Sequence, residues 1–315
     1  MPRYFFYNFA RAVGRLGKPI AGSRMLLSRP TANPIAMKLL FAVAALFPLY
    51  ATSFAQSPTT ASTKTGSPVA ASTVAHAHND YEHARPFFDA AELGFGSIEA
   101  DVWLVNDTLF VAHDRKDIRR ERTLEKLYLE PFAAWRKTHA NPRFLLVDLK
   151  TGGDATVRAL EKALKPYRGL FFPENPQGVR LTVSGAMPAP ERFGEFDEIL
   201  FFDGRRKTAY SPAALARVGL VSAPFYEVGG FWNGKTPLPD DRRGRVKTFV
   251  DSLHAVGKPV RFWATPDTPL AYQTLADLGV DFVGTDDLRG LAEFLKVAPT
   301  RRLELRVRPR RRPPH

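Results

Sequence analysis

Two carboxylates and a histidine lie within one short stretch of the sequence that could do chemistry. Glu99 and Asp101 are two positions apart in residues 97–114, SIEADVWLVNDTLFVAHD, and His113 and Asp114 end this stretch. In a β-strand, side chains at i and i+2 point to the same face. Two carboxylates held this close repel each other unless a cation or a proton compensates their charge. The spacing therefore predicts a hard metal ion bound by oxygens. The alternative is a half-exposed strand with a solvated polar face.

A third carboxylate lies in a run that is otherwise apolar. Residues 144–150, FLLVDLK, place Asp148 and Lys150 on one strand face. A parallel sheet tolerates such a charge pair in its interior only if each charge finds partners. With Glu99 and Asp101, Asp148 would complete an oxygen site typical of Mg²⁺ or Ca²⁺. Lys150 would then face a substrate phosphate. The alternative is a local ion pair between Asp148 and Lys150 in the core.

A histidine pair ends the first predicted strand. His76 and His78 share a face in residues 75–81, AHAHNDY, and His78 lies nearer the C-terminal end of the strand. A histidine at that end suits general acid–base work, because the unperturbed pKa of the side chain is about 6.5. We expect His76 and the nearby His83 to pack or to cap the backbone.

Short apolar runs alternate with amphipathic segments from residue 73 onward. This pattern predicts a parallel α/β fold, and eight such units over roughly 220 residues fit a (β/α)8 TIM barrel. The runner-up is an open, doubly wound sheet. The predicted strands are Thr73–His78, Ser97–Leu104, Phe144–Lys150, Arg180–Ser184, Glu198–Asp203, Leu220–Tyr226, Pro259–Ala264 and Asp281–Thr285. The predicted helices are 86–93, 123–139, 154–166, 211–217, 241–256 and 268–278, and Gly94, Gly169, Gly257 and Gly279 lie near helix ends.

The polar residues at the strand ends favour the barrel. In a barrel all C-terminal strand ends converge on one mouth, whereas in an open sheet they spread along an edge. Residues 108–113 should pair with the second strand as a hairpin that turns at Asn106-Asp107. The glycines of residues 225–234, FYEVGGFWNG, predict a flexible loop over the mouth. The polar residues at or just past strand ends are His78, Glu99, Asp101, Asp148, Lys150, Ser184, Tyr226, Trp263 and Asp286.

The formal charge of +13 belongs to the ends of the chain. Residues 1–79 carry eight Lys or Arg and no acid, and residues 301–315 carry seven Arg and one Glu, so only −1 is left for residues 80–300. Nucleic-acid binding needs a basic face on the folded domain, so we do not expect a nucleic-acid partner. The chain has no cysteine, which excludes disulfides, thiolate metal sites and a lipidated cysteine.

The terminal segments predict export and little structure. Residues 37–55 have a charged start, an apolar run and a small-residue cleavage site, which is typical of a signal peptide and too short for a membrane span. Residues 1–36 are then a basic extension from a mis-called start. The alternative is a transit peptide, which would direct the chain to mitochondria. Residues 56–72 predict a disordered linker, 73–297 the barrel domain, and 298–315 a basic disordered tail that contacts an anionic surface weakly or has no partner.

These motifs together resemble a known family. The EAD pair, the His-Asp after a short hairpin and the histidine that ends the first strand resemble the glycerophosphodiester phosphodiesterase and phosphatidylinositol-phospholipase-C-like superfamily of TIM barrels. Three segments are most similar to the branch of altered inheritance of mitochondria protein 6: AHNDYEHARPFFDAAELGFGSIEADVWL, VAHD and TLEKLYLEPF. VDLKTGG and FWATPD are similar to elements of sphingomyelinase D enzymes in that superfamily.

The resemblance implies a role for each site residue. It implies that His78 and His113 are the catalytic acid–base pair and that Lys150 contacts the phosphate. The sequence departs from the diesterases in having Asn79-Asp80 after the first histidine instead of Arg-Gly, and in lacking their Pro-Glu-Asn-Thr element. The residues expected to hold one divalent cation, Mg²⁺ or Ca²⁺, are Glu99, Asp101 and Asp148, and those expected to bind substrate with Lys150 are Trp263, Asn79 and Tyr226.

The expected function is a metal-dependent phosphoric diester hydrolase. Its substrate would be a small-molecule or lipid phosphodiester, such as a glycerophosphodiester or a phospholipid headgroup. One alternative is an exported binding protein that keeps the pocket without turnover, although binding alone needs no acid–base pair. The other is a glycosidase, but carboxylates at i and i+2 of one strand are too close to flank a glycosidic bond.

Overall fold

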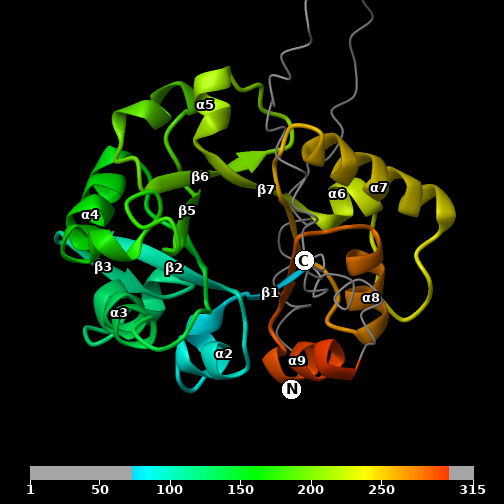
Figure 1. Cartoon of the computed structure of the whole chain (residues 1–315), viewed down its shortest axis with the longest axis horizontal. Coiled ribbons are helices and arrows are strands. Elements are labelled where there is room, and N and C mark those ends of the chain that lie inside the picture. Colours follow the sequence, from blue (N-terminus) through cyan, green and yellow to red (C-terminus); the bar gives the residue numbers. More distant parts are fainter. Residues whose placement is uncertain (1–72, 298–315) are drawn as a thin grey trace, which may run out of the picture. The chain divides into compact units, whose positions relative to one another are not determined.

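Eight parallel strands close into a barrel, because the first strand pairs with both the second and the last. A computed structural model describes residues 73–297 of the chain. Its strands run in the order β1-β9-β8-β7-β6-β5-β4-β2 and close through β1–β2, with β3 antiparallel on β2 (Figure 1). The predicted TIM barrel is therefore confirmed and the open sheet is excluded. The strands are β1 Val74–Ala77, β2 Ser97–Val105, β3 Thr108–Val111, β4 Phe144–Leu149, β5 Arg180–Gly185, β6 Leu200–Arg205, β7 Val218–Pro224, β8 Val260–Trp263 and β9 Phe282–Thr285.

Helices and short turns follow the strands and cover the outside of the barrel (Figure 1). Sequence signals mark where two of them begin: Ser211 and Thr268 accept hydrogen bonds from backbone N–H groups three residues on, and a proline follows each. The helices are α2 Phe88–Glu92, α3 Glu130–Trp135, α4 Asp154–Leu164, α5 Pro212–Ala216, α6 Phe225–Gly229, α7 Asp240–His254, α8 Pro269–Asp277 and α9 Leu288–Val297. The short turns are η1 Asp80–Glu82, η2 Arg115–Asp117, η3 Glu125–Leu129, η4 Lys165–Leu170 and η5 Pro190–Glu195.

The two faces of the strands have opposite chemistry. On β2, Ile98, Ala100 and Val102 are fully buried and join the main apolar core, which packs the strands against the helices. The alternate residues face the barrel interior. A separate small cluster of Leu146, Leu220 and Phe282, with Val74 and Phe144 against it, fills that interior near the N-terminal strand ends. The interior is therefore apolar at one end and polar toward the mouth.

The hairpin forms as predicted, and the glycine-rich segment does not. Asn106 and Asp107 have positive φ angles of 48° and 59° and connect β2 to β3. Residues 225–234 were expected to be a flexible loop, but Phe225–Gly229 is helix α6. The physical reason is burial: Phe225 is 1% exposed and packs edge-on against Phe262 of β8. Since β7 ends at Pro224, Tyr226 lies on a helix and not at a strand end.

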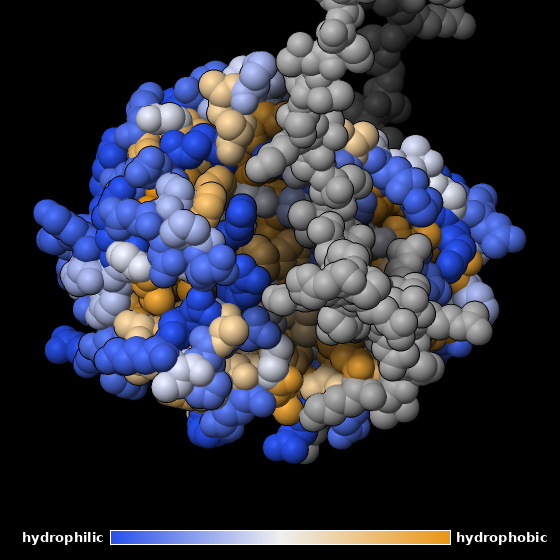
Figure 2. All heavy atoms as spheres, viewed as in Figure 1, coloured by the Kyte–Doolittle hydropathy of each residue, from blue (hydrophilic) through white to orange (hydrophobic). Residues whose placement is uncertain are grey.

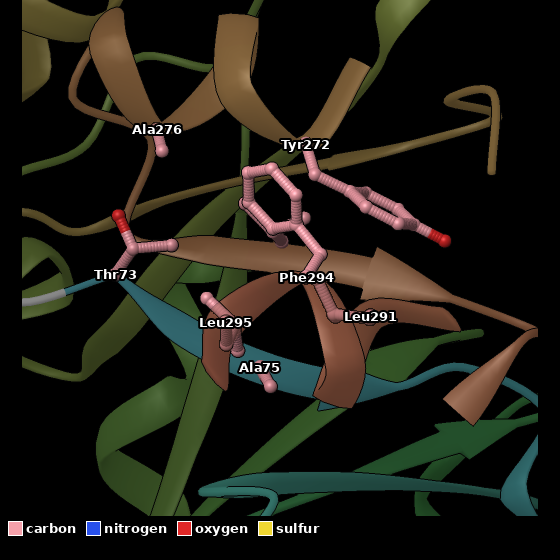
Figure 3. Close-up of a pocket in the computed structure, with 8 residues that line it drawn as sticks. Thr73, Ala75, Tyr272, Ala276, Leu291, Phe294 and Leu295 are labelled. Atoms are coloured by element: carbon pink, nitrogen blue, oxygen red, sulfur yellow. The ribbon is translucent and has the colours of Figure 1, made fainter. Parts of the chain in front are cut away.

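One pocket lies outside the barrel wall (Figure 3). Ala75 of β1, Tyr272 and Ala276 of α8, and Leu291 and Phe294 of α9 line it, and no charged side chain does. Figure 2 shows mostly hydrophilic residues over α4, beside a hollow in which hydrophobic residues show. Among residues 73–297 no helix is long and apolar enough to cross a membrane. The predicted extension, signal peptide, linker and tail at 1–36, 37–55, 56–72 and 298–315 lie outside the described residues.

Candidate active site

The pairing of β2 with β4 brings predicted site residues of both strands together near the C-terminal strand ends. Asp101 on β2 is the direct register partner of Asp148 on β4. Lys150 follows β4, and its Nζ lies 2.8 Å from Asp101 Oδ2 and 2.7 Å from Asp148 Oδ2. Burial alone would lower the pKa of Lys150, but the two carboxylate charges outweigh it and raise the pKa. The ammonium is therefore held charged between the two aspartates.

The pKa of Asp148 is raised as well, but burial is the cause here. Burial raises its pKa, and the charge and hydrogen bond of Lys150 oppose this rise without cancelling it. The negative charge of Asp101 next to it also raises the pKa. Asp148 is therefore protonated more easily than a free aspartate, in spite of its ion pair with Lys150.

Glu99 lies deeper in the barrel and is paired with a cation that the sequence did not single out. Its Oε2 accepts hydrogen bonds from Arg261 Nη2 of β8 and, at 2.9 Å, from His76 Nε2 of β1. Burial opposes the charged form, but the Arg261 charge and the His76 hydrogen bond hold the pKa of Glu99 well below its usual range. Burial and Arg261 lower the pKa of His76 to about 4. His76 thus packs as a neutral ring, and its Nδ1 lies 2.7 Å from Ser97 Oγ.

Side chains that follow β9 and β1 contact the ring of His78. Its Nδ1 lies 2.7 Å from Asp286 Oδ1, just after β9, and 3.1 Å from Asn79 Nδ2. Burial would lower the pKa of His78, but the hydrogen bond to Asp286 and the charges of Glu99 and Asp286 outweigh it and raise the pKa. Asn79, expected to bind substrate, also donates to Asp286 Oδ1 at 3.3 Å. Its side chain therefore orders the loop after β1.

His113 is the second histidine at the mouth. Its Nδ1 lies 3.1 Å from Asp101 Oδ2 and 3.2 Å from the Tyr81 hydroxyl. The hydrogen bond to Asp101 raises the pKa of His113, although partial burial opposes it. Each histidine thus turns Nδ1 toward an aspartate. Nε2 of each ring makes no hydrogen bond to any residue between 73 and 295, so it is the nitrogen left for chemistry.

The opposite wall of the mouth carries a polar cluster from β5, β6 and β7. Asp203 Oδ2 accepts hydrogen bonds from Ser184 Oγ at 2.8 Å and Arg205 Nη1 at 2.9 Å, and its Oδ1 accepts from the backbone N–H of Ser222. Burial raises the pKa of Asp203, against the charges of Arg205 and Arg261. Ser184 is among the polar strand-end residues that the sequence analysis names, whereas Asp203 appears there only as the last residue of the predicted strand Glu198–Asp203.

Aromatic side chains lie beside the mouth where β7 and β8 end. Trp263 ends β8 and meets Tyr226 of α6 edge to face, with ring centroids 6.1 Å apart. Tyr226 in turn stacks on Phe231, at 5.6 Å and 11°. All three are exposed. The structure therefore brings together two predicted substrate-binding residues, Trp263 and Tyr226, although Tyr226 comes from a helix.

Comparisons with known proteins find one family repeatedly. The family profile described as an AIM6-like phosphodiesterase domain matches residues 67–143. This part of the chain is therefore similar to the AIM6-like phosphodiesterase family. It is 28% identical over 254 residues to altered inheritance of mitochondria protein 6 homolog of Arthroderma benhamiae, covering 68% of this chain and 81% of that protein. It is 26% identical over 269 residues to altered inheritance of mitochondria protein 6 of Eremothecium gossypii, covering 70% and 68%.

The AIM6-like match covers the first part of the site. Residues 67–143 include both mouth histidines, Glu99 and Asp101, and the resemblance read from these motifs is confirmed. A solved structure of glycerophosphodiester phosphodiesterase from Agrobacterium tumefaciens is 15% identical, with a TM-score of 0.45, and covers 71% of this chain and 100% of that one. The assignment of the fold as a barrel rests on the strand pairings described above.

The carboxylates of this AIM6-like site suit a hard cation by their type. All three offer oxygen donors, and Asp101 Oδ1 is buried without a hydrogen-bond partner among residues 73–295. In the described residues, however, no group of three His, Asp or Glu side chains is arranged to hold a metal ion as it stands. The reason is that Lys150 lies between Asp101 and Asp148 while Arg261 takes Glu99. A cation at these oxygens would have to displace both basic groups.

Arg261 and Tyr81 are among the residues of the site that the sequence analysis did not single out. Arg261 interrupts the apolar run of residues 260–263, VRFW, two positions before Trp263 and so on the same strand face. That spacing was the signal that could have found it. Tyr81 follows the first histidine motif, and a tyrosine in a loop gives no comparable signal.

Proposed function

We propose that this barrel is a metal-dependent phosphodiesterase that uses His78 and His113 as its acid–base pair. One observation carries the proposal: both histidines bind an aspartate through Nδ1, on either side of a carboxylate cluster that holds Lys150. A binding protein would need no second histidine with a bound carboxylate. The match to a phosphodiesterase domain supports hydrolysis of a phosphodiester at this coarse level.

The charges of the site fit a substrate that is already an anion. Attack on a phosphodiester needs its negative charge to be neutralised. Lys150 supplies a positive charge 2.8 Å from Asp101, the carboxylate partner of His113. Glu99, Asp101 and Asp148 would hold one divalent cation, Mg²⁺ or Ca²⁺. When bound, that cation supplies positive charge to the phosphoryl oxygens. Asp101 Oδ1, the unpartnered oxygen, is the donor most in need of it.

We assign proton transfer to Nε2 of His78 and Nε2 of His113. One histidine removes a proton from the nucleophile, which is a water or a hydroxyl of the substrate itself, and the other protonates the leaving alkoxide. The raised pKa of both rings favours the charged imidazole, the form that donates a proton from Nε2. Asp286 and Asp101 stabilise the charged forms.

The substrate we propose is a small-molecule or lipid phosphodiester, such as a glycerophosphodiester or a phospholipid headgroup. Trp263 and Tyr226 would contact the part of the substrate that projects from the mouth. We retain export as the proposed location. Mitochondria are the alternative, with which the names of the two fungal relatives are consistent.

The first test is an assay of the full chain stripped of metal. It uses bis(p-nitrophenyl) phosphate and a panel of lysophospholipids, with and without added Mg²⁺ or Ca²⁺. Turnover that requires the cation and vanishes in His78→Ala would support the proposal. Cation-dependent thermal stabilisation without turnover on any of these substrates would instead favour a binding protein. Turnover that is unchanged by chelation would refute the metal dependence.

A further inference from the structure

Tyr81 places a hydroxyl at the centre of the mouth although it lies in the turn η1 after β1. The residue is 3% exposed. Its hydroxyl lies 2.6 Å from Asp101 Oδ2, 2.7 Å from Asn79 Oδ1 and 3.2 Å from His113 Nδ1. These neighbours come from three different segments of the chain. The hydroxyl therefore contacts His113 of the proposed acid–base pair and Asp101, a proposed cation ligand. It also contacts Asn79, whose Nδ2 lies 3.1 Å from Nδ1 of His78, the other member of the pair.

The position of the Tyr81 ring is fixed by its surroundings. The Tyr81 carbonyl oxygen accepts a hydrogen bond from Arg122 Nη2. Asn79, two residues before it, has a left-handed backbone with φ 49° and ψ 36°, a conformation that asparagine tolerates better than most residues. Burial together with these contacts leaves the hydroxyl little freedom to move.

The single hydroxyl proton of Tyr81 determines how the hydroxyl interacts with His113. Tyr81 has one hydroxyl proton, and two of its neighbours, the oxygens of Asp101 and Asn79, can only accept it. The proton therefore goes to one of them and does not point at His113. His113 Nδ1 then faces two oxygens that can both accept, Asp101 Oδ2 at 3.1 Å and the Tyr81 hydroxyl at 3.2 Å. A bare nitrogen lone pair there would be repelled.

His113 needs such a restraint because little else holds its ring. Its side chain is 56% exposed, whereas that of Asp101 is 2% exposed. A ring held by one contact could rotate or exchange its proton between the two nitrogens. Two acceptors on Nδ1 fix both the ring plane and the nitrogen that carries the proton.

We propose that Tyr81 is a positioning residue that keeps the proton of neutral His113 on Nδ1 and so leaves Nε2 as the working nitrogen. In the neutral ring Nε2 then accepts a proton, and in the charged ring Nε2 donates one. The role in turnover rests on the proposed function, while the position of the proton does not. The two parts can therefore be tested separately.

The test compares Tyr81→Phe with a matched variant, Tyr128→Phe. Tyr128 is also fully buried, and its hydroxyl donates to a carboxylate, Asp80 Oδ2, at 3.0 Å. Each change removes one buried hydroxyl and one hydrogen bond to an aspartate, so the cost in stability should be alike. Of the two tyrosines, Tyr81 is the one that contacts His113. Any effect confined to Tyr81→Phe is then due to its place in the mouth.

The main readout is the tautomer of His113, which needs no substrate. Two-bond ¹H–¹⁵N correlation spectra of protein with ¹⁵N-labelled histidine are recorded at a pH at which the ring is neutral, and the signals of His113 are those missing from His113→Gln. We expect the Nδ1–H tautomer alone in the wild type and in Tyr128→Phe, and a mixture of tautomers in Tyr81→Phe. A single Nδ1–H tautomer in Tyr81→Phe would overturn the inference, as would the same mixture in Tyr128→Phe.

Turnover gives the second readout. On a phosphodiester that the wild type hydrolyses, Tyr81→Phe should lower kcat about tenfold with little change in KM, because the ring loses orientation but no substrate contact is removed. A rise in KM with unchanged kcat would overturn the positioning role. If the wild type hydrolyses none of the phosphodiesters, the proposed function fails, and the tautomer spectra still decide the inference.

Discussion

Asp286 and His78 join the last strand of the barrel to the first, with Asp286 Oδ1 2.7 Å from His78 Nδ1. The two residues are 208 positions apart and meet only because β9 pairs with β1. A carboxylate bonded to Nδ1 favours the charged imidazole, and the pKa of His78 is raised in spite of burial. Closure of the sheet thus completes a histidine–aspartate pair at the mouth.

Asp286→Asn should move one limb of the pH–rate profile to lower pH. The carboxylate raises the pKa of His78, so its removal must lower that pKa, and the limb that His78 controls moves with it. The measurement is kcat/KM against pH on a phosphodiester substrate. Asp287→Asn is the matched control, because Asp287 is the next residue and accepts a hydrogen bond from the backbone N–H of Gly290. A limb that moves to higher pH in Asp286→Asn would contradict the pairing.

His113→Ala should abolish turnover without unfolding the protein. The side chain is 56% exposed and lies in no apolar cluster, so its loss leaves no core cavity. General acid–base catalysis contributes about 100-fold to 10,000-fold, and a loss of that size is expected in kcat. The measurement pairs the assay with the thermal midpoint. His139→Ala is the control, since His139 stacks on Trp135 away from the mouth, and full activity in His113→Ala would show that its role is misassigned.

Glu99→Gln should weaken cation binding about tenfold or more, because one of three charged oxygen ligands becomes neutral. The measurement is isothermal titration of Mg²⁺ or Ca²⁺ into the full chain. Asp281→Asn is the control: it also removes a buried carboxylate, which bonds His254 Nε2 at 2.7 Å and the backbone N–H of Val260. If both variants kept the wild-type affinity, Glu99 would serve Arg261 and not a metal.

The positions of the site residues on their strands could be predicted from local spacing. The rule that i and i+2 share a face put Glu99 and Asp101 on the interior face of β2, and both are buried there while Ile98 and Ala100 face the helices. The count of eight βα units fitted a barrel, and the polar residues at the C-terminal strand ends favoured it over an open sheet. The roles of the site residues stay predictions.

The partners of those residues could not be predicted, because barrel closure creates them. Glu99 meets Arg261 over 162 positions, and no local pattern encodes that contact. The glycines show the same limit. Gly94, Gly257 and Gly279 have positive φ angles of 83°, 70° and 83° after helices, whereas Gly169 lies inside the turn η4. A glycine marks a permitted bend, and the packing around it decides whether the bend occurs.

Asp80 should make folding stability depend on pH in a direction opposite to that of most acids. Its carboxylate is fully buried, with Oδ2 accepting hydrogen bonds from the Phe87 N–H and the Tyr128 hydroxyl, and Oδ1 without a partner. Burial raises its pKa from 3.8 to about 6, although both hydrogen bonds oppose the shift. The unfolded chain therefore releases this proton at lower pH than the folded chain does.

It follows that the contribution of Asp80 is fully present below pH 4 and is lost as the pH rises through 6. Relative to Asp80→Asn, the wild type should lose up to about 3 kcal/mol of unfolding free energy between these limits. Urea unfolding of both proteins at steps from pH 4 to 7 measures the difference. Tyr128→Phe should steepen the loss, because the hydroxyl lowers the pKa of Asp80. A difference between wild type and Asp80→Asn that stays constant with pH would show that the carboxyl titrates alike in both states.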